Sequence, residues 1–244
     1  GVLAVVTGDD FPGLGEVKDQ DLATNVMARD RALYHGHAVA AVAAVSESVA
    51  SAALDAIEVE YEVLPALMSM DDALAPDAPI LYEDVFTQGL DETPTEPSNV
   101  PQKFALSGGD LEKGFAEADV IVEREFVTPT VHQGYIEPHA TLATINEGGR
   151  ATVWSSTQGH FSVRGAVSGV LNMDMDKIKV VPSEIGGGFG GKLTLYLEPV
   201  ALLLSQKTGG RPVKLAMNRE EVFRASGPVS ASRSRIKVGA KKDG

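Results

Sequence analysis

Residues 178–204, IKVVPSEIGGGFGGKLTLYLEPVALLL, run from an apolar segment through a glycine-rich loop into a second apolar segment. The first segment predicts a β-strand, and the second, which is stopped by Gly209 and Gly210, predicts a buried helix. Glycine at this density lets the backbone adopt positive φ and lets a ligand approach the main chain closely. A strand, a glycine loop and a helix in this order are typical of α/β folds whose helix N-termini bind anions or polar cofactor groups.

The same loop has most of a phosphate-binding P-loop. Residues Gly186 to Lys192 fit the spacing G-x-x-x-x-G-K. The next residue should be a serine or threonine that binds magnesium, but it is Leu193. There is also no clear partner strand that ends in a magnesium-binding aspartate. Nucleotide binding therefore remains an alternative, although the sequence lacks both of the residues that would bind magnesium.

Composition narrows the class of protein. The chain has 244 residues, 43% of them hydrophobic, which is enough for one large or two modest domains. A formal net charge of −13 argues against binding to nucleic acids or anionic membranes. The absence of cysteine excludes disulfides, thiolate zinc sites, a cysteine nucleophile and a protein-ligated iron–sulfur cluster. No apolar run approaches roughly 18 residues, and no basic signal-peptide region opens the chain, so we expect a cytoplasmic location.

Residues 1–66 predict a compact α/β unit. Apolar residues 2–6 predict a strand, and residues 37–45 predict either a buried strand or, from their alanine content, a helix. A helix with Ser46 or Ser48 as its N-cap should follow. Residues 57–65 alternate apolar side chains with glutamates and predict a half-buried strand. Residues 67–118 are rich in proline and acidic side chains and predict a surface linker, with a short helix capped by Asp110.

Residues 119–244 predict a second α/β layer with a mixed sheet. A strand begins at Val120, and residues 141–156 predict a hairpin around a short glycine turn. Residues 160–173 predict a helix with one apolar face, formed by Phe161, Val163, Val167, Val170 and Leu171. Beyond the glycine loop and its helix, residues 211–223 predict a strand and a short helix, and the alternation near the C-terminus predicts another strand.

Several motifs in a consistent order resemble the molybdenum hydroxylases, which include xanthine dehydrogenase, aldehyde oxidoreductase and the large subunits of carbon monoxide dehydrogenase-like enzymes. The motifs are GVLAVVTGDDFPG at 1–13, HQGYIEPHATLA at 132–143, WSSTQGH at 154–160, PSEIGGGFGGK at 182–192 and KTGGRPVKLAMNREEVF at 207–223. The resemblance covers essentially the whole chain. It implies an α/β hammerhead domain at residues 1–66, followed by the first part of a molybdenum-cofactor-binding domain at residues 119–244.

The resemblance also implies which residues bind the molybdenum–pterin cofactor. Gln158 would donate a hydrogen bond to the apical oxygen of the molybdenum. Phe189 and Gly190 would lie against the metal and the pterin. The remaining implied cofactor-binding residues are glycines that let the backbone approach: Gly187, Gly188 and Gly191. No side chain of the chain is expected to ligate the metal.

The residues alone leave other roles open. Gln158 could be a simple strand-end residue, and Phe189 could pack in the core. Lys192 could hold a phosphate or cover the surface, and Glu137 with Pro138 predicts a structural turn. The five histidines lack a paired spacing typical of metal ligands.

The resemblance further implies hydroxylation with water as the source of oxygen. Purine-oxidising members carry a substrate-contacting glutamate where this chain has Leu193, so the predicted substrates are aldehydes, aromatic or heterocyclic compounds, or CO. The catalytic general base is expected beyond residue 244, so the chain alone should be inactive and hold the cofactor weakly. Expected partners are the small-molecule substrate, the rest of the catalytic subunit, and iron–sulfur and FAD subunits or domains. The alternative is a non-catalytic structural or assembly module.

Overall fold

The computed structural model describes residues 1–243, and these form two units that we treat separately. Unit 1 combines residues 1–58 with residues 128–232, and unit 2 combines residues 59–127 with residues 233–244. Unit 1 therefore brings together two stretches that are far apart in the sequence. It contains all of the predicted cofactor-binding residues.

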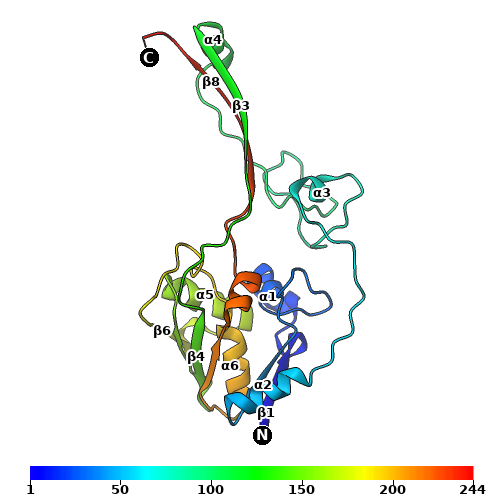
Figure 1. Ribbon diagram of the computed structural model, residues 1–244, viewed down its shortest axis with the longest axis vertical. Helices are drawn as coiled ribbons and strands as arrows, with labels where there is room; N and C mark the ends of the chain where they lie inside the picture. Colours follow the sequence, from blue (N-terminus) through cyan, green and yellow to red (C-terminus); the bar gives the residue numbers. More distant parts are fainter. Residues whose placement is uncertain (244) are drawn as a thin grey trace. The chain divides into compact units, whose positions relative to one another are not determined.

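A mixed four-stranded sheet is the main layer of unit 1, with the strand order β6-β5-β4-β7. Figure 1 labels β6 and β4 of this sheet. Strands β4 (Ala140–Ile145) and β5 (Ala151–Ser155) form the predicted antiparallel hairpin, and Gly149 in its turn has φ of 72°. Strand β6 (Ile178–Pro182) runs parallel to β5, and β7 (Val213–Ala216) runs antiparallel to β4. The predicted mixed sheet is confirmed.

A smaller antiparallel sheet joins β1 (Val2–Thr7) to β2 (Ala40–Ala44). This pairing settles the alternative for residues 37–45 in favour of a strand. Helix α2 (Glu47–Asp55) follows, and the Oγ of its N-cap Ser46 accepts a hydrogen bond from the Val49 amide at 3.3 Å, as expected from the sequence. The connection between β1 and β2 contains the short 3₁₀ helices Gly8–Asp10 and Leu14–Glu16 and helix α1 (Gln20–Val26).

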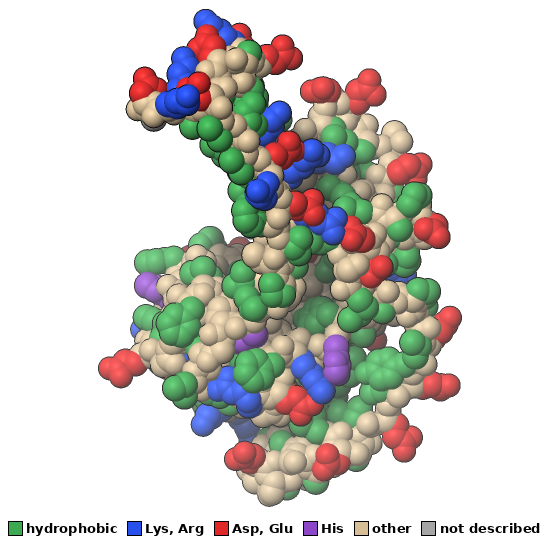
Figure 2. Space-filling view, turned by 45° about the horizontal axis from the view of Figure 1, so that its top comes forward, with side chains coloured by type: hydrophobic (Ala, Val, Ile, Leu, Met, Phe, Trp, Pro, Cys, Tyr) green, Lys and Arg blue, Asp and Glu red, His purple; other side chains and the backbone are tan. Residues whose placement is uncertain are grey.

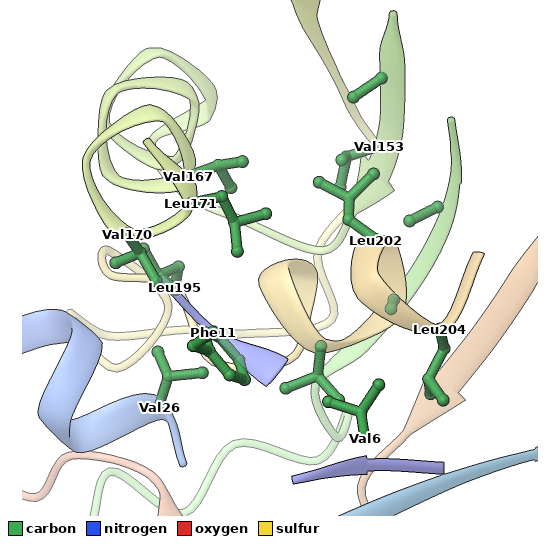
Figure 3. Packing of buried hydrophobic residues seen from close by; sticks show 14 of the residues in the cluster. Val6, Phe11, Val26, Val153, Val167, Val170, Leu171, Leu195, Leu202 and Leu204 are labelled. Carbon is green, nitrogen blue, oxygen red and sulfur yellow. The ribbon is translucent and has the colours of Figure 1, made fainter. Parts of the chain in front are cut away.

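Helix α6 (Glu198–Lys207) holds the two sheets of unit 1 together. It packs on β4 and β7 of the larger sheet and on β1 and β2 of the smaller one (Figure 1). Figure 3 shows Leu202 and Leu204 from this helix in one cluster with Val6 of β1 and Val153 of β5. Each fully buried side chain of this size stabilises the fold by about 1.5–3 kcal/mol. Residues 1–58 and 128–232 therefore share a single hydrophobic core.

Two helix predictions need correction. The helix after the glycine loop does not follow it directly but begins at Glu198, because Pro199 favours the first turn of a helix. In helix α5 (His160–Leu171), Phe161 is not part of the buried face, since it is 71% exposed. At 100° per residue it lies on the opposite side of the helix from Val163 and Val167, which are fully buried. No helix of residues 1–243 has the length and apolar character needed to cross a membrane.

The remaining elements of unit 1 flank the sheet. The 3₁₀ helix Met175–Lys177 leads from α5 into β6. Helix α7 (Arg219–Ala225) follows β7, and its N-cap Asn218 accepts a hydrogen bond from the Glu221 amide at 2.9 Å. The predicted strand and short helix of residues 211–223 are thus both present.

Unit 2 contains a two-stranded ribbon and two short helices. Strand β3 (Val120–Thr128) pairs with β8 (Ser232–Ala240), and both strands were predicted. Helix α4 (Leu111–Ala116) precedes the ribbon, and the predicted cap Asp110 accepts a hydrogen bond from the Lys113 amide at 2.9 Å. All residues of both strands are exposed, including their apolar side chains: Val120, Ile121, Val122, Phe126, Val127, Ile236 and Val238. Figure 2 shows hydrophobic side chains at the surface of the molecule, next to charged ones.

The acidic, proline-rich segment of unit 2 folds on itself through Asn99. Its Oδ1 accepts a hydrogen bond from the Leu81 amide at 3.0 Å, and its Nδ2 donates to the carbonyls of Ala73 and Pro79. Helix α3 (Met70–Leu74) lies within this segment and is capped by Ser69. The Asn99 side chain thus joins three positions of this segment, and backbone hydrogen bonds such as that from the Gln88 amide to the Pro101 carbonyl at 2.9 Å add to its order.

The strand predicted at residues 57–65 is wrong. These residues pair with no strand of residues 1–243, and Val63 is 90% exposed. Alternation of apolar and charged side chains makes a segment suitable for a sheet, but a strand exists only when another strand supplies its hydrogen bonds.

Candidate functional site

Gln158 and the glycine loop meet at one edge of the larger sheet. Strands β5 and β6 are parallel neighbours, so the segments that follow them emerge at the same edge. The side-chain Oε1 of Gln158 accepts hydrogen bonds from the amides of Gly190 and Lys192, each at 3.1 Å. The Gln158 amide in turn donates to the Lys192 carbonyl at 2.9 Å. Both segments were expected to contribute to one site, and the structure brings them together.

This arrangement leaves several donors unused. Since Oε1 of Gln158 is engaged by the loop, its exposed amide group can donate only through Nε2, which has no partner within residues 1–243. The peptide N–H groups of Gly187, Gly188 and Phe189 also have no hydrogen-bond partner in that range. The side-chain amide of Gln158 and three consecutive backbone N–H groups of the loop are therefore neutral donors without a partner, and such donors suit a ligand rich in oxygen acceptors.

Phe189 has an uncommon backbone conformation. Its φ is 49°, between the positive φ values of Gly187 at 97° and Gly190 at 88°. The side chain is 73% exposed, so the alternative that Phe189 packs in the core is wrong. A non-glycine residue in the left-handed region costs about 1–2 kcal/mol. This conformation turns the phenyl ring outward beside the unused donors of the loop.

Three glycines of the loop lie so close to other side chains that an added Cβ would force a shift. A Cβ on Gly186 would lie 2.7 Å from Cβ of Glu137. A Cβ on Gly188 would lie 2.5 Å from Oε1 of Gln158, and a Cβ on Gly191 would lie 2.7 Å from Cε1 of Tyr135. Gly188 does not have positive φ, so close approach to Gln158 is what requires glycine at this position. The loop backbone thus lies close to side chains of the chain itself, and its close approach to a ligand stays a prediction.

Lys192 is buried, whereas the sequence predicted that it would either hold a phosphate or cover the surface. Its side chain is 1% exposed, and Nζ lies 2.5 Å from Oε2 of Glu137 and 5.1 Å from the centre of the Tyr135 ring. A P-loop lysine must reach the phosphates of a nucleotide. This ammonium is instead paired with a carboxylate beneath the loop. The nucleotide-binding alternative therefore also lacks a lysine that can reach a phosphate, in addition to the missing serine or threonine and the missing aspartate.

A buried polar network supports Tyr135 under the loop. The Tyr135 hydroxyl lies 2.6 Å from Nε2 of His139 and 3.0 Å from Oγ of Ser226. Ser226 donates to the Val222 carbonyl at 2.6 Å, so its Oγ accepts from its other partners. The donation therefore runs from His139 to Tyr135 to Ser226. No sequence pattern indicated this network, because its members come from the end of α7 and from the segment before β4 and share no regular spacing.

Burial, together with the positive charges of Lys192 and His132, lowers the pKa of His139 to about 4. The folded state therefore binds the proton more weakly than the unfolded chain, in which the imidazole pKa is about 6.5. This neutral histidine contributes its full stability above pH 6.5 and loses it as the pH falls toward 4.

Because of His139, we expect the free energy of unfolding to be about 3 kcal/mol lower at pH 4 than at pH 7. Urea denaturation at a series of pH values would measure the loss. The matched control is His139→Asn, which keeps a donor for Tyr135 but does not titrate, so its stability should fall less steeply over the same range. Equal slopes for the two proteins would contradict the assignment.

Leu193 and Gln133 are two further residues near the loop. Leu193 is exposed at the end of the loop, and its contact with substrate stays a prediction. Among residues 1–243, no three His, Asp or Glu side chains are grouped so that they could hold a metal ion. Gln133, which no sequence pattern singled out, lies beside Gly191, and its buried Oε1 has no hydrogen-bond partner in the described chain.

Comparison with protein-family models gives two matches. Residues 1–65 match the aldehyde oxidase and xanthine dehydrogenase a/b hammerhead domain. Residues 93–244 match the molybdopterin cofactor-binding domain. The second match includes Gln158 and the entire glycine loop.

Individual proteins match over the whole chain. The chain is 36% identical to a probable xanthine dehydrogenase of Bacillus subtilis, of which it covers 31%, and 33% identical to the nicotinate dehydrogenase large molybdopterin subunit of Eubacterium barkeri, of which it covers 54%. Among solved structures, aldehyde oxidoreductase from Desulfovibrio gigas aligns with a TM-score of 0.80 at 27% identity, over 100% of this chain and 26% of that one. CO dehydrogenase from Oligotropha carboxidovorans aligns with a TM-score of 0.79 at 29% identity, over 100% and 31%. The chain thus spans about a third of the length of the first-named relative.

Proposed function

The chain belongs to the molybdenum hydroxylase family, and from that membership we propose that its glycine loop and Gln158 form one wall of a molybdenum–pterin site in an oxidoreductase. The chain covers a hammerhead domain and the N-terminal part of the cofactor-binding region of such a catalytic subunit. We propose the division 1–66, 67–118 and 119–244 for these parts. Its first boundary is supported by the hammerhead match, which ends at residue 65.

The residues present fit this cofactor. Gln158 is held by two loop amides so that a neutral N–H donor remains exposed, and this single observation carries the proposal. Three unpartnered backbone N–H groups, at 187, 188 and 189, can donate to phosphate or pterin oxygens without side-chain bulk. The adjacent exposed ring of Phe189 offers an apolar surface. A metal that is ligated by its own cofactor needs no cluster of protein ligands.

When bound, the molybdenum–pterin group supplies the redox chemistry of a hydroxylation that takes its oxygen from water. The residues of this chain bind and orient that group. Gln158 donates a hydrogen bond through Nε2 while its Oε1 stays on the loop. Gly188 and Gly191 bring the loop backbone close to Gln158 and Tyr135, and the ring of Phe189 would lie against one side of the bound group.

The proposed substrates are aldehydes, aromatic or heterocyclic compounds, or CO. Support comes from Leu193, an exposed apolar residue at the end of the loop, whose side chain cannot accept or donate hydrogen bonds to a purine. The relative from Eubacterium barkeri is named for nicotinate, an aromatic heterocycle, whereas the relative from Bacillus subtilis is named as a probable xanthine dehydrogenase. The proposed partners are the rest of the catalytic subunit and electron carriers with iron–sulfur clusters and FAD, because the chain has no cysteine to hold a cluster.

Molybdenum content tests the proposal. The full-length protein should be purified from a host that makes the molybdenum cofactor, as wild type, Gln158→Ala and Gln158→Glu. The glutamate variant keeps the acceptor for the two loop amides but removes the N–H donor. We expect both variants to hold the cofactor about 10- to 100-fold more weakly, because the cofactor loses a hydrogen-bond donor.

The matched control is Gln206→Ala, which replaces an exposed glutamine on α6 away from the loop. This variant should retain the molybdenum content of the wild type. Full occupancy in both Gln158 variants would overturn the proposed role of the glutamine. A wild-type protein that is folded but free of molybdenum would favour the structural or assembly module.

A further inference from the structure

Both ends of the glycine loop are attached to the same carboxylate. Oε2 of Glu137 accepts a hydrogen bond from the Gly186 amide at 2.8 Å and contacts Nζ of Lys192 at 2.5 Å. Gly186 opens the loop and Lys192 closes it. The Glu137 amide also donates to the Gly186 carbonyl at 3.3 Å, so the residue is bonded to the loop through main chain and side chain.

Lys192 connects this carboxylate to Gln158. Its side chain reaches Glu137, while its amide donates to Oε1 of Gln158 at 3.1 Å. Its carbonyl accepts from the Gln158 amide at 2.9 Å and from Oγ1 of Thr157 at 3.1 Å. The position of the Lys192 backbone therefore determines where Oε1 of Gln158 finds its donors, and so where Nε2 points.

Because Lys192 is buried, its ion pair with Glu137 matters for the stability of the loop. Lys192 is fully buried, and a charged ammonium removed from water needs an opposite charge or it destabilises its surroundings. Glu137 provides the one salt bridge to Lys192 that residues 1–243 contain. Glu137 is itself well anchored, because Arg219 donates hydrogen bonds to the carbonyls of both preceding residues, Tyr135 and Ile136.

We propose that Glu137 is a positioning residue, which sets the register of the glycine loop against Gln158 through the buried ammonium of Lys192. Its importance for catalysis rests on the function proposed above. The coupling between Glu137, Lys192 and the loop is a property of this chain alone and is measurable without the cofactor.

The test uses the full-length protein with four changes: Glu137→Gln, Glu137→Asp, Lys192→Met, and Glu137→Gln combined with Lys192→Met. The first readout is hydrogen exchange, by mass spectrometry, of peptides covering residues 184–195 in protein depleted of cofactor. The second is molybdenum content after expression with the cofactor. The control is Asp174→Asn with Lys177→Met, which removes an exposed ion pair whose charged atoms lie 3.0 Å apart.

We expect Glu137→Gln to accelerate exchange of the loop by about 10- to 100-fold, because a buried charge loses its partner. Glu137→Asp should partly restore protection, since it keeps the charge on a shorter side chain. The double variant should be closer to wild type than Glu137→Gln alone, because no unpaired charge remains. Peptides of β4 and β5 should stay protected in all variants, and the control should leave the loop unchanged.

The outcomes separate this inference from the proposed function. Unchanged loop exchange in Glu137→Gln, or strictly additive effects in the double variant, would overturn the positioning role whatever the molybdenum content. A general loss of protection in every variant, including β4 and β5, would also overturn it, since the pair would then support the whole unit rather than the loop. Faster loop exchange with undiminished molybdenum content would support the positioning role and contradict the proposed cofactor wall.

Discussion

Replacing Gly188 with alanine is expected to lower the molybdenum content of the full-length protein to about a tenth of wild type or less. The new Cβ would lie 2.5 Å from Oε1 and 2.7 Å from Cδ of Gln158, so the glutamine side chain must move. Its displacement breaks the hydrogen bonds to Gly190 and Lys192 and removes the orientation of Nε2. Gly188 does not have positive φ, and the atoms that its new Cβ would meet belong to the Gln158 side chain, so the fold itself should tolerate the change.

Elemental analysis and a thermal melt of the same sample would measure both effects. The matched control is Gly165→Ala in α5, where an added Cβ meets nothing within 4 Å. This control should keep its molybdenum and gain up to about 1 kcal/mol of stability from helix propensity. Normal molybdenum content in Gly188→Ala would show that the contact between loop and glutamine does not matter for the cofactor.

Leu204→Ala is expected to destabilise unit 1 by about 2–5 kcal/mol, because it empties a fully buried position. Leu204 belongs to α6, which packs on the strands of both sheets of this unit. The loss corresponds to a decrease in melting temperature of roughly 5–15 °C for a chain of this size. Fluorescence of Trp154, the single tryptophan of the chain and a residue of β5, would follow the unfolding.

Leu54→Ala provides the comparison, since this leucine lies on α2 and is 49% exposed. It should change the free energy of unfolding by less than about 1 kcal/mol. If residues 1–58 unfolded separately from residues 128–232, Leu204→Ala would produce two transitions rather than one shifted transition. That result would contradict the shared core.

The sequence predicts most local elements of this chain because their signals are local. The glycine pair at 148 and 149 and the alternation on either side predict the β4–β5 hairpin, and Ser46 and Asp110 predict helix starts that the structure confirms. The segment at 57–65 has an equally clear pattern, yet it forms no strand among residues 1–243. Its pairing depends on a partner strand, and a side-chain pattern does not contain that information.

The candidate site likewise contains residues that local motifs predict and contacts that they do not predict. Gln158 and the glycines of the loop follow from motifs of short spacing, and the structure brings them together. The pairing of Lys192 with Glu137 joins residues 55 positions apart, and neither residue has a local pattern that specifies the other. The network of Tyr135, His139 and Ser226 likewise forms only when α7 packs near the segment before β4. Such tertiary contacts between single polar side chains leave no periodic signal in the sequence.

If the unpartnered donors of Gln158 and the glycine loop bind a molybdenum–pterin cofactor, the metal itself must lie beside these residues. Anomalous diffraction at the molybdenum absorption edge, from crystals of the full-length protein, would locate it. We expect a molybdenum peak on the side of the loop where Nε2 of Gln158 and the ring of Phe189 are exposed. A peak remote from these residues, or a nucleotide phosphate bound in the loop in place of a pterin, would contradict the proposed site.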